Sequence, residues 1–184
     1  SNETIMKILN LLSIAVLSLG LFSSPVNHEV IIRTADGGAV SLNTTKYYQR
    51  SATDILLTKT NAEGNEEWFK IYGGSSYDKA SDLIATNDGG YAIVGSTSSY
   101  GKGNYDIYVI KVNSMGKEEW SQTYGGFYNE YGYSIKQKRD GGYYLYGTKQ
   151  ACFGDTGAPN CDDQKYRISI NAKGRVKQEG VPAK

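Results

Sequence analysis

The chain lacks most of the residue types on which catalytic and metal chemistry depends. Its 184 residues include one histidine, His28, and two cysteines, Cys152 and Cys161. One histidine, far from both cysteines in sequence, leaves no Ser-His or Cys-His catalytic pair and gives zinc too few ligands. Neither a Walker loop nor a dinucleotide-binding glycine motif is present. We therefore expect a protein that is not an enzyme and needs no cofactor.

An excess of charge of one sign is also absent. Lysine and arginine number 20 against 19 aspartates and glutamates, the net charge is +1, and the charged residues are scattered. Nucleic acids and anionic membrane surfaces attract clustered positive charge, so neither is an expected partner. Only three prolines and two methionines occur, whereas 16 tyrosines and 22 glycines favour β-strands and tight turns.

Long hydrophobic runs are missing except near the N-terminus. Residues 8–22 are mostly apolar, follow a short basic start and precede small residues. This order is typical of a secretory signal peptide, and the run is shorter than the roughly 20 residues of a membrane span. We expect residues 1–27 to be such a segment or an anchor, helical in form, with a packing or core helix as the alternative. The protein is predicted to be secreted, periplasmic or on the cell surface, with membrane contact only if this segment is retained.

A sequence repeat predicts the architecture. Asp-Gly-Gly occurs at residues 36–38, 88–90 and 140–142, a regular spacing of 52 residues. Each copy contains four short strand-like runs separated by turn residues, and four strands make one blade of a β-propeller. In the second copy the runs are residues 79–86, 91–97, 106–112 and 117–124.

We therefore predict an all-β domain over residues 28–184. It consists of three four-stranded propeller-type blades, at residues 29–76, 77–128 and 129–184. In the third run of the second copy, residues 106–112, apolar residues occupy both faces, as expected for a sheet that is covered on both sides. Trp68 and Trp120 occur once per copy. We expect them to pack between neighbouring sheets.

The repeat carries a distinctive residue pattern. Asp-x4-Lys-x-Asn-x2-Gly-x3-Trp-x3-Tyr-Gly-Gly, followed by Asp-Gly-Gly-Tyr, is most complete in the second copy. The pattern resembles the β-propeller repeats of secreted bacterial and archaeal proteins and, more loosely, the blades of quinoprotein-type propellers. The third copy departs from it, because Ser169 replaces Lys111 and Gln178 replaces Trp120. A divergent last repeat is expected where it caps the end of a stack.

Three blades are too few for a closed ring, since propellers typically have about four to eight. Two chains related by a twofold axis would complete a six-bladed ring. Alternatively, the blades stack openly, with the N-terminal segment or neighbouring subunits of a fibre on the end faces. A third possibility is a fragment of a longer propeller lineage.

The third copy is six residues longer than the others in the region of the two cysteines. In an exported chain, Cys152 and Cys161 are predicted to form a local disulfide that closes this loop. The same loop offers a cation an alternative set of oxygen ligands, namely Asp155, Asp162 and Asp163.

Loops that join one blade to the next share an end of the fold with the loops between second and third strands. Rigid scaffolds commonly present binding residues on such loops. Aromatic residues beside acids in these loops suit a sugar or peptide, because the rings stack and the acids accept hydrogen bonds. The candidate ligand-binding residues are Tyr77, Asp78, Tyr100, Tyr105, Phe127, Tyr128 and Glu130.

Together these features predict a non-catalytic repeat scaffold outside the cytoplasm. Its expected role is cell-surface interaction or self-assembly, as a homo-oligomer or a fibre-type assembly. The alternative is a carbohydrate- or peptide-binding propeller that uses the blade-connecting loops. A hydrolase fragment is a more distant alternative.

Overall fold

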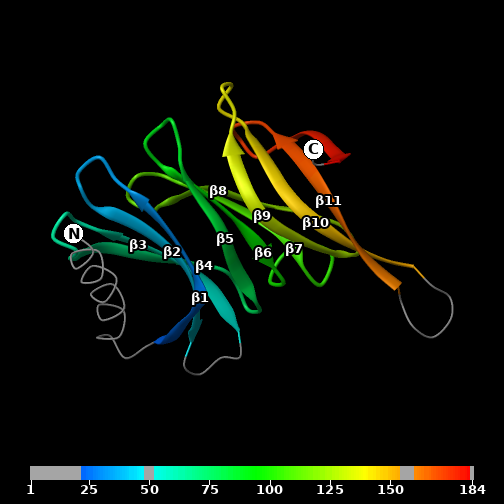
Figure 1. Cartoon of the computed structure of the whole chain (residues 1–184), viewed down its shortest axis with the longest axis horizontal. Helices are drawn as coiled ribbons and strands as arrows, with labels where there is room; N and C mark the ends of the chain where they lie inside the picture. Colours follow the sequence, from blue (N-terminus) through cyan, green and yellow to red (C-terminus); the bar gives the residue numbers. More distant parts are fainter. Residues whose placement is uncertain (1–21, 48–51, 154–159, 183–184) are drawn as a thin grey trace.

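The computed structural model describes residues 22–47, 52–153 and 160–182 of the chain. These residues form three four-stranded antiparallel sheets that lie side by side (Figure 1). The predicted all-β class and the four strands in each of three copies are confirmed. Residues 1–21, which include most of the predicted signal or anchor segment, lie outside the described part.

Each sheet is built from four strands that are consecutive in the chain. Sheet 1 contains β1 (Phe22–Arg33), β2 (Ala39–Tyr47), β3 (Thr53–Thr60) and β4 (Glu66–Tyr72). Sheet 2 contains β5 (Asp78–Ala85), β6 (Tyr91–Thr97), β7 (Asp106–Val112) and β8 (Glu118–Tyr124). Sheet 3 contains β9 (Asn129–Gln137), β10 (Tyr143–Phe153), β11 (Asn160–Ile170) and β12 (Val176–Pro182). β1 begins at Phe22, within the range 1–27 predicted as a separate segment.

The Asp-Gly-Gly repeats form the first hairpin turn of each sheet. In sheet 2, the Gly89 N–H donates to the Thr86 carbonyl and the Thr86 N–H donates to the Gly90 carbonyl, both at 2.9 Å. The Asp88 carboxylate accepts hydrogen bonds from the Gly90 N–H and the Thr86 hydroxyl. Gly89 has a φ of +80°, a left-handed conformation that favours glycine. The regular spacing of the motif therefore reflects a repeated turn.

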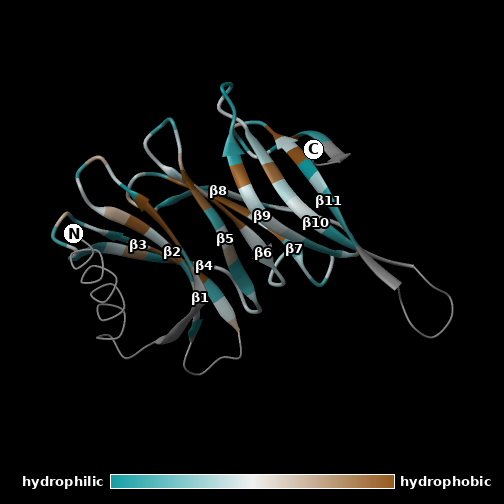
Figure 2. Cartoon of the chain, in the orientation of Figure 1, coloured by the Kyte–Doolittle hydropathy of each residue, from teal (hydrophilic) through white to brown (hydrophobic). Residues whose placement is uncertain are grey.

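Two hydrophobic layers hold the three sheets together. Ile93 of β6 and Ile110 of β7 face sheet 1, whereas their strand neighbours Val94 and Val109 face sheet 3. The alternation of the strand places these side chains on opposite faces, and all four are fully buried. Figure 2 shows the hydrophobic residues along the packed strands and hydrophilic residues at the turns. The prediction that the second copy is covered on both faces is confirmed.

The tryptophans pack where one sheet meets the next, as predicted. A Cβ added to Gly116, in the turn between β7 and β8, would lie 2.7 Å from the Trp68 ring of sheet 1. The Tyr72 hydroxyl donates a 2.5 Å hydrogen bond to the Gly116 carbonyl. The same arrangement recurs between sheets 2 and 3, where Trp120 contacts the corresponding turn. Sheets 1 and 2 thus each anchor their last strand on a turn of the sheet that follows.

A buried lysine joins the first turn of sheet 2 to its last strand. Lys111 Nζ lies 3.0 Å from Asp88 and 2.8 Å from Glu119, and it donates to the Val112 carbonyl at 3.0 Å. Sheet 1 contains the equivalent group around Lys59. These contacts show that the repeated charged residues bind one another within each sheet.

Sheet 3 builds the equivalent group differently. Ser169 occupies the position of Lys111, and Lys138 occupies the position of Thr86. Lys138 Nζ lies 3.1 Å from the Ser169 hydroxyl and 3.6 Å from the Asp140 carboxylate. The ammonium group is therefore retained beside the turn, although it comes from the residue that follows β9.

The outward face of sheet 3 differs from the equivalent face of sheet 2. Arg167 lies over the Tyr144 ring at 4.7 Å, and Lys136 lies over the Tyr146 ring at 5.6 Å. The repeat position of Tyr146 is occupied in sheet 2 by buried Val94. Cations above aromatic faces give this end of the stack a polar surface, as the last repeat of a stack requires.

Candidate functional site

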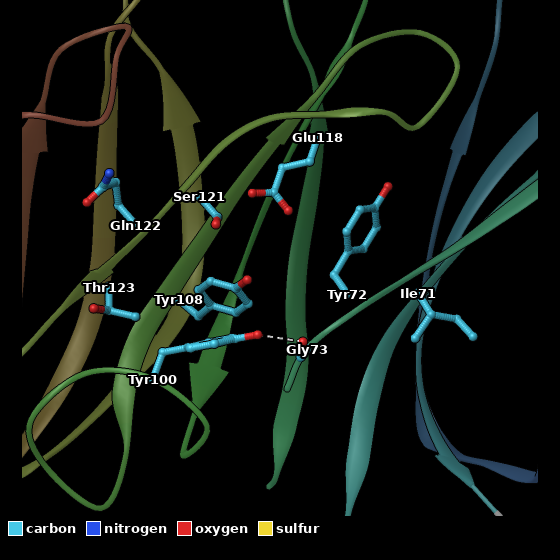
Figure 3. A pocket seen from close by; sticks show the side chains of 9 residues that line it. All are labelled: Ile71, Tyr72, Gly73, Tyr100, Tyr108, Glu118, Ser121, Gln122 and Thr123. Atoms are coloured by element: carbon cyan, nitrogen blue, oxygen red, sulfur yellow. Dashed lines mark hydrogen bonds between the residues drawn. The ribbon is translucent and has the colours of Figure 1, made fainter. Parts of the chain in front are cut away.

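A pocket of about 460 Å³ lies where sheets 1 and 2 meet (Figure 3). Sheet 1 contributes the end of β4, and sheet 2 contributes β7, β8 and the loop between β6 and β7. This size is typical of pockets that bind small ligands, which have about 300–1,000 Å³. The residues that give the pocket its chemical character are Tyr72, Gly73, Tyr100, Tyr108, Glu118 and Ser121.

Three tyrosine rings enclose the pocket. The rings of Tyr100 and Tyr108 have centroids 5.6 Å apart and an angle of 46° between their planes. Tyr72 lies across the pocket from them in Figure 3. The Tyr100 hydroxyl donates a 2.7 Å hydrogen bond to the Gly73 carbonyl, which ties the β6–β7 loop of sheet 2 to the end of β4. The rings are thus held from both sheets.

Glu118 is the one acidic residue among those that line the pocket. Its neighbour Glu119 points to the buried Lys111. In Figure 3 the Glu118 carboxylate lies between Tyr72 on one side and Tyr108 on the other. Within residues 22–47, 52–153 and 160–182, no lysine or arginine forms a salt bridge with Glu118. Its negative charge is available to a ligand.

The tyrosine hydroxyls respond to this negative charge. Burial, followed by the charge of Glu118, raises the pKa of Tyr72. Burial and the same carboxylate raise the pKa of Tyr108 to about 12. The pKa of Tyr100 is raised by burial and then by the charges of Asp78, Glu118 and Asp54. All three rings are therefore neutral at physiological pH and lie in a negative electrostatic potential.

Two buried carboxylates stand behind Gly73. A Cβ at this position would lie 2.2 Å from Asp54 Oδ1 and 2.7 Å from Asp78 Oδ2, so only glycine fits. Asp78 is 0% exposed, and its Oδ2 accepts hydrogen bonds from the Gly74 N–H and the Ser99 hydroxyl. Its Oδ1 has no hydrogen-bond partner. The two acids organise the loops around the pocket and add to its negative potential.

Of the sequence-predicted residues, only Tyr100 lines this pocket. Its side chain is 45% exposed. Asp78 lies behind the pocket as a loop-organising acid, and Tyr77 is exposed beside it. These three residues belong to the junction of sheets 1 and 2.

The other predicted residues lie at the junction of sheets 2 and 3. Tyr105 packs at 5.4 Å from the Tyr131 ring, and Tyr128 lies under the ammonium group of Lys149 at 4.7 Å. Phe127 is 90% exposed. Glu130 is buried and accepts a hydrogen bond from the Gly126 N–H. The seven residues are thus divided between two junctions.

Sequence reasoning missed Tyr72, Tyr108 and Glu118. Tyr72 belongs to the repeated Tyr-Gly-Gly, and Glu118 belongs to a Glu-Glu-Trp that also occurs in the first copy, so the repeat itself accounts for both residues without a ligand. The alternation of side chains along β7 could have identified Tyr108. Ile110 and Tyr108 are two residues apart in β7 and face sheet 1, which places the Tyr108 ring at the junction.

The loop of the third copy is described in part. Cys152 and Cys161 are Cα partners in the β10–β11 ladder, but their side chains lie outside the described features, so the disulfide stays a prediction. Asp155 and the side chain of Asp162 are also outside them. In the described part of the chain there is no group of three histidine, cysteine or acidic side chains that could hold a metal ion.

The described residues contain no helix that is long and apolar enough to cross a membrane. Comparison of the sequence with models of protein families and with curated proteins gives no match.

Proposed function

We propose that the protein is a non-catalytic binding module whose ligand occupies the pocket between sheets 1 and 2. The observation that carries the proposal is the set of three tyrosine rings and an unpaired carboxylate around one open pocket. Aromatic faces stack on a ligand while polar groups orient it, which is how small-ligand sites combine affinity and specificity. The sequence suggests a peptide or a carbohydrate as the source of this ligand.

Binding is favoured over hydrolysis by the chemistry of the lining. Glycoside hydrolysis uses two carboxyl groups on either side of the scissile bond. Glu118 is the one acid among the residues that line the pocket. The pocket therefore offers contacts and a charge, but not the pair of groups that this reaction needs.

Titration calorimetry with short peptides and oligosaccharides tests the proposal. We expect Tyr100→Ala to weaken binding strongly, because it removes one wall of the pocket while leaving the buried layers intact. Tyr128→Ala is the matched control, since Tyr128 is equally exposed at the other junction. Equal losses in the two variants would contradict the assignment of the pocket.

We also propose that the protein acts outside the cytoplasm, on the strength of the apolar run at residues 8–22. Fractionation of cells that express the full chain provides the test. Accumulation of the protein in the cytoplasm would contradict this part of the proposal.

Self-assembly is a second candidate function, favoured by the way the sheets fan out. β5 contacts β1, β2 and β3, and β9 contacts β5, β6 and β7, so the first strand of each later sheet packs across the sheet before it. Sheets 1 and 3 each have one face against which no other described sheet packs. Two chains would complete a six-bladed ring through these faces. Sedimentation velocity distinguishes a discrete dimer or a fibre, either of which supports assembly, from a monomer, which excludes it.

A further inference from the structure

We propose that the pocket between sheets 1 and 2 selects an organic cation, the ammonium group of an amine or quaternary-ammonium ligand. The group would lie among the rings of Tyr72, Tyr100 and Tyr108, beside the carboxylate of Glu118. This inference rests on the proposed binding function and names the chemical class of the ligand.

The first support is the aromatic enclosure. A cation within about 6 Å of an aromatic face is attracted by the negative face of the ring, most strongly when it is shielded from water. Tyr100 and Tyr108 are tilted toward each other at 46°, and Tyr72 faces them across the pocket (Figure 3). Three rings from two sheets thus present a concave aromatic surface around a space large enough for an alkylated ammonium group.

The second support is the charge of the pocket. Glu118 lines it, and no lysine, arginine or histidine is among the nine residues that do so. The carboxylates of Asp54 and Asp78 lie directly behind Gly73. A neutral ligand would leave this negative potential unbalanced, whereas a cation compensates it.

The third support is the comparison between the two junctions. Tyr124 and Tyr166 occupy the repeat positions of Tyr72 and Tyr108, but Val176 replaces Glu118. The junction of sheets 2 and 3 is nevertheless packed, with Tyr124 buried and its hydroxyl bonded to the Gly174 carbonyl. Packing of a junction therefore does not require the carboxylate.

The remaining groups specify where the rest of the ligand lies. Ser121 and Thr123 of β8 lie opposite Ile110 and Tyr108, the β7 residues that face sheet 1. Their hydroxyl groups offer hydrogen bonds to a polar part attached to the ammonium group. The expected ligand is therefore a small cationic head joined to a polar or peptide-like body.

Titration calorimetry of the full chain with choline tests the inference. The neutral isostere 3,3-dimethylbutan-1-ol has the same shape without the charge. We expect choline to bind about tenfold more tightly than the isostere, because the tyrosine rings and the Glu118 carboxylate both attract the ammonium group. Glu118→Gln should remove the part of this factor that the carboxylate supplies and leave binding of the isostere unchanged.

Glu66→Gln is the matched control, because Glu66 occupies the same repeat position at the start of β4 and does not line the pocket. It should bind choline as the wild type does. Both glutamates are exposed, so neither substitution threatens the fold. Circular dichroism of each variant checks this point.

The outcomes separate the two proposals. Equal binding of choline and its isostere, or binding of neutral sugars or calcium but not choline, would overturn the cation assignment and leave a binding module. If none of these probes and no peptide binds, both proposals fail. Loss of choline binding in Glu66→Gln as well as Glu118→Gln would place the site elsewhere and overturn the inference.

Discussion

At the scale of single residues, the ammonium group beside each Asp-Gly-Gly turn is the most informative feature. It comes from the third strand in sheets 1 and 2 and from the residue that follows the first strand in sheet 3. Lys111 is 3% exposed, and its three oxygen partners satisfy all its donors. A buried ammonium group left without such partners is costly, so the lysine and its acceptors act as a unit.

In sheet 3, Lys138 and Ser169 stand at the repeat positions of Thr86 and Lys111. This difference predicts that two substitutions in sheet 2 compensate for each other. Lys111→Ser should lower the free energy of unfolding by about 2 kcal/mol, because it removes hydrogen bonds to charged partners. Adding Thr86→Lys should recover at least half of this loss, since it reproduces the arrangement of Lys138 and Ser169. Urea unfolding of the two variants measures both effects.

Thr86→Lys alone provides the control for this pair. It places two ammonium groups beside Asp88 and should be destabilising by itself. If the double variant is no more stable than Lys111→Ser, the two lysine arrangements are not equivalent.

Acid should weaken sheet 2 through the same turn. The Thr86 hydroxyl, followed by Lys111 and the Gly90 N–H, holds the pKa of Asp88 at about 2, below its ordinary value of 3.8. A lowered pKa contributes stability that is complete above 3.8 and is lost as the pH falls through 2. We therefore expect the urea midpoint to drop between pH 4 and 2.

Asp88→Asn isolates this contribution. The variant should be less stable than the wild type at pH 7, and the difference should shrink as the pH approaches 2. A difference that stays constant over this range would show that the Asp88 charge does not act through the turn.

At the scale of the elements, the packing of one sheet on the next depends on a turn that has no room for a side chain, as at Gly116 between β7 and β8. Gly116 and Gly64 are repeat equivalents with φ values of +71° and +86°. A Cβ on Gly64 would meet nothing within 4 Å, whereas one on Gly116 would meet Trp68. The two glycines therefore share a backbone requirement but differ in their neighbours.

This difference gives a direct measure of the packing between sheets. Gly64→Ala should cost about 1 kcal/mol, the penalty of a left-handed conformation for alanine. Gly116→Ala should cost about 1–3 kcal/mol more, because overpacking displaces the Trp68 ring. Thermal or urea unfolding of both variants provides the comparison, and equal losses would mean that Trp68 moves away without cost.

The β10–β11 ladder places Cys152 directly opposite Cys161. Antiparallel partners have Cα atoms about 4.5–5.5 Å apart, which suits a disulfide. We expect protein from an oxidising compartment to resist thiol alkylation until it is reduced. Cys152→Ser should then lower stability by about 2–3 kcal/mol. Two alkylated cysteines in the unreduced protein, shown by mass spectrometry, would contradict the pairing.

The strands were predictable from sequence because turn and strand chemistry recur at one interval. Asp-Gly-Gly marks the first hairpin, and Trp68 and Trp120 mark the packing between sheets. The pocket was not predictable in the same way. Tyr72 and Glu118 come from different sheets and occur in repeated motifs, so only the three-dimensional junction shows that they meet.

At the scale of the whole molecule, sheet 2 differs from its neighbours because it is packed on both faces. Every residue of β6 and β7 is buried, whereas in β8 Tyr124 alone is buried. The two layers share these central strands, so opening either layer exposes them.

Hydrogen exchange should reflect this arrangement. Amides of β6 and β7 should exchange slowest, because their exposure requires global unfolding, while those of the edge strand β4 should exchange sooner. Exchange measured by mass spectrometry on the intact protein tests this order. Faster amide hydrogen exchange in β6 than in β4 would contradict the prediction that the central strands are exposed only by global unfolding.

The different position of the lysine in sheet 3 also limits how the copies of the repeat can recombine. A crossover that joined the first strand of copy three to the later strands of copy two would place Lys138 and Lys111 around one aspartate. The reciprocal product would combine Thr86 with Ser169 and lose the buried ammonium group, so that only the exposed Lys177 would pair with that aspartate. Viable exchanges between these copies are therefore confined to break points between sheets, so whole copies are the natural units of duplication and loss.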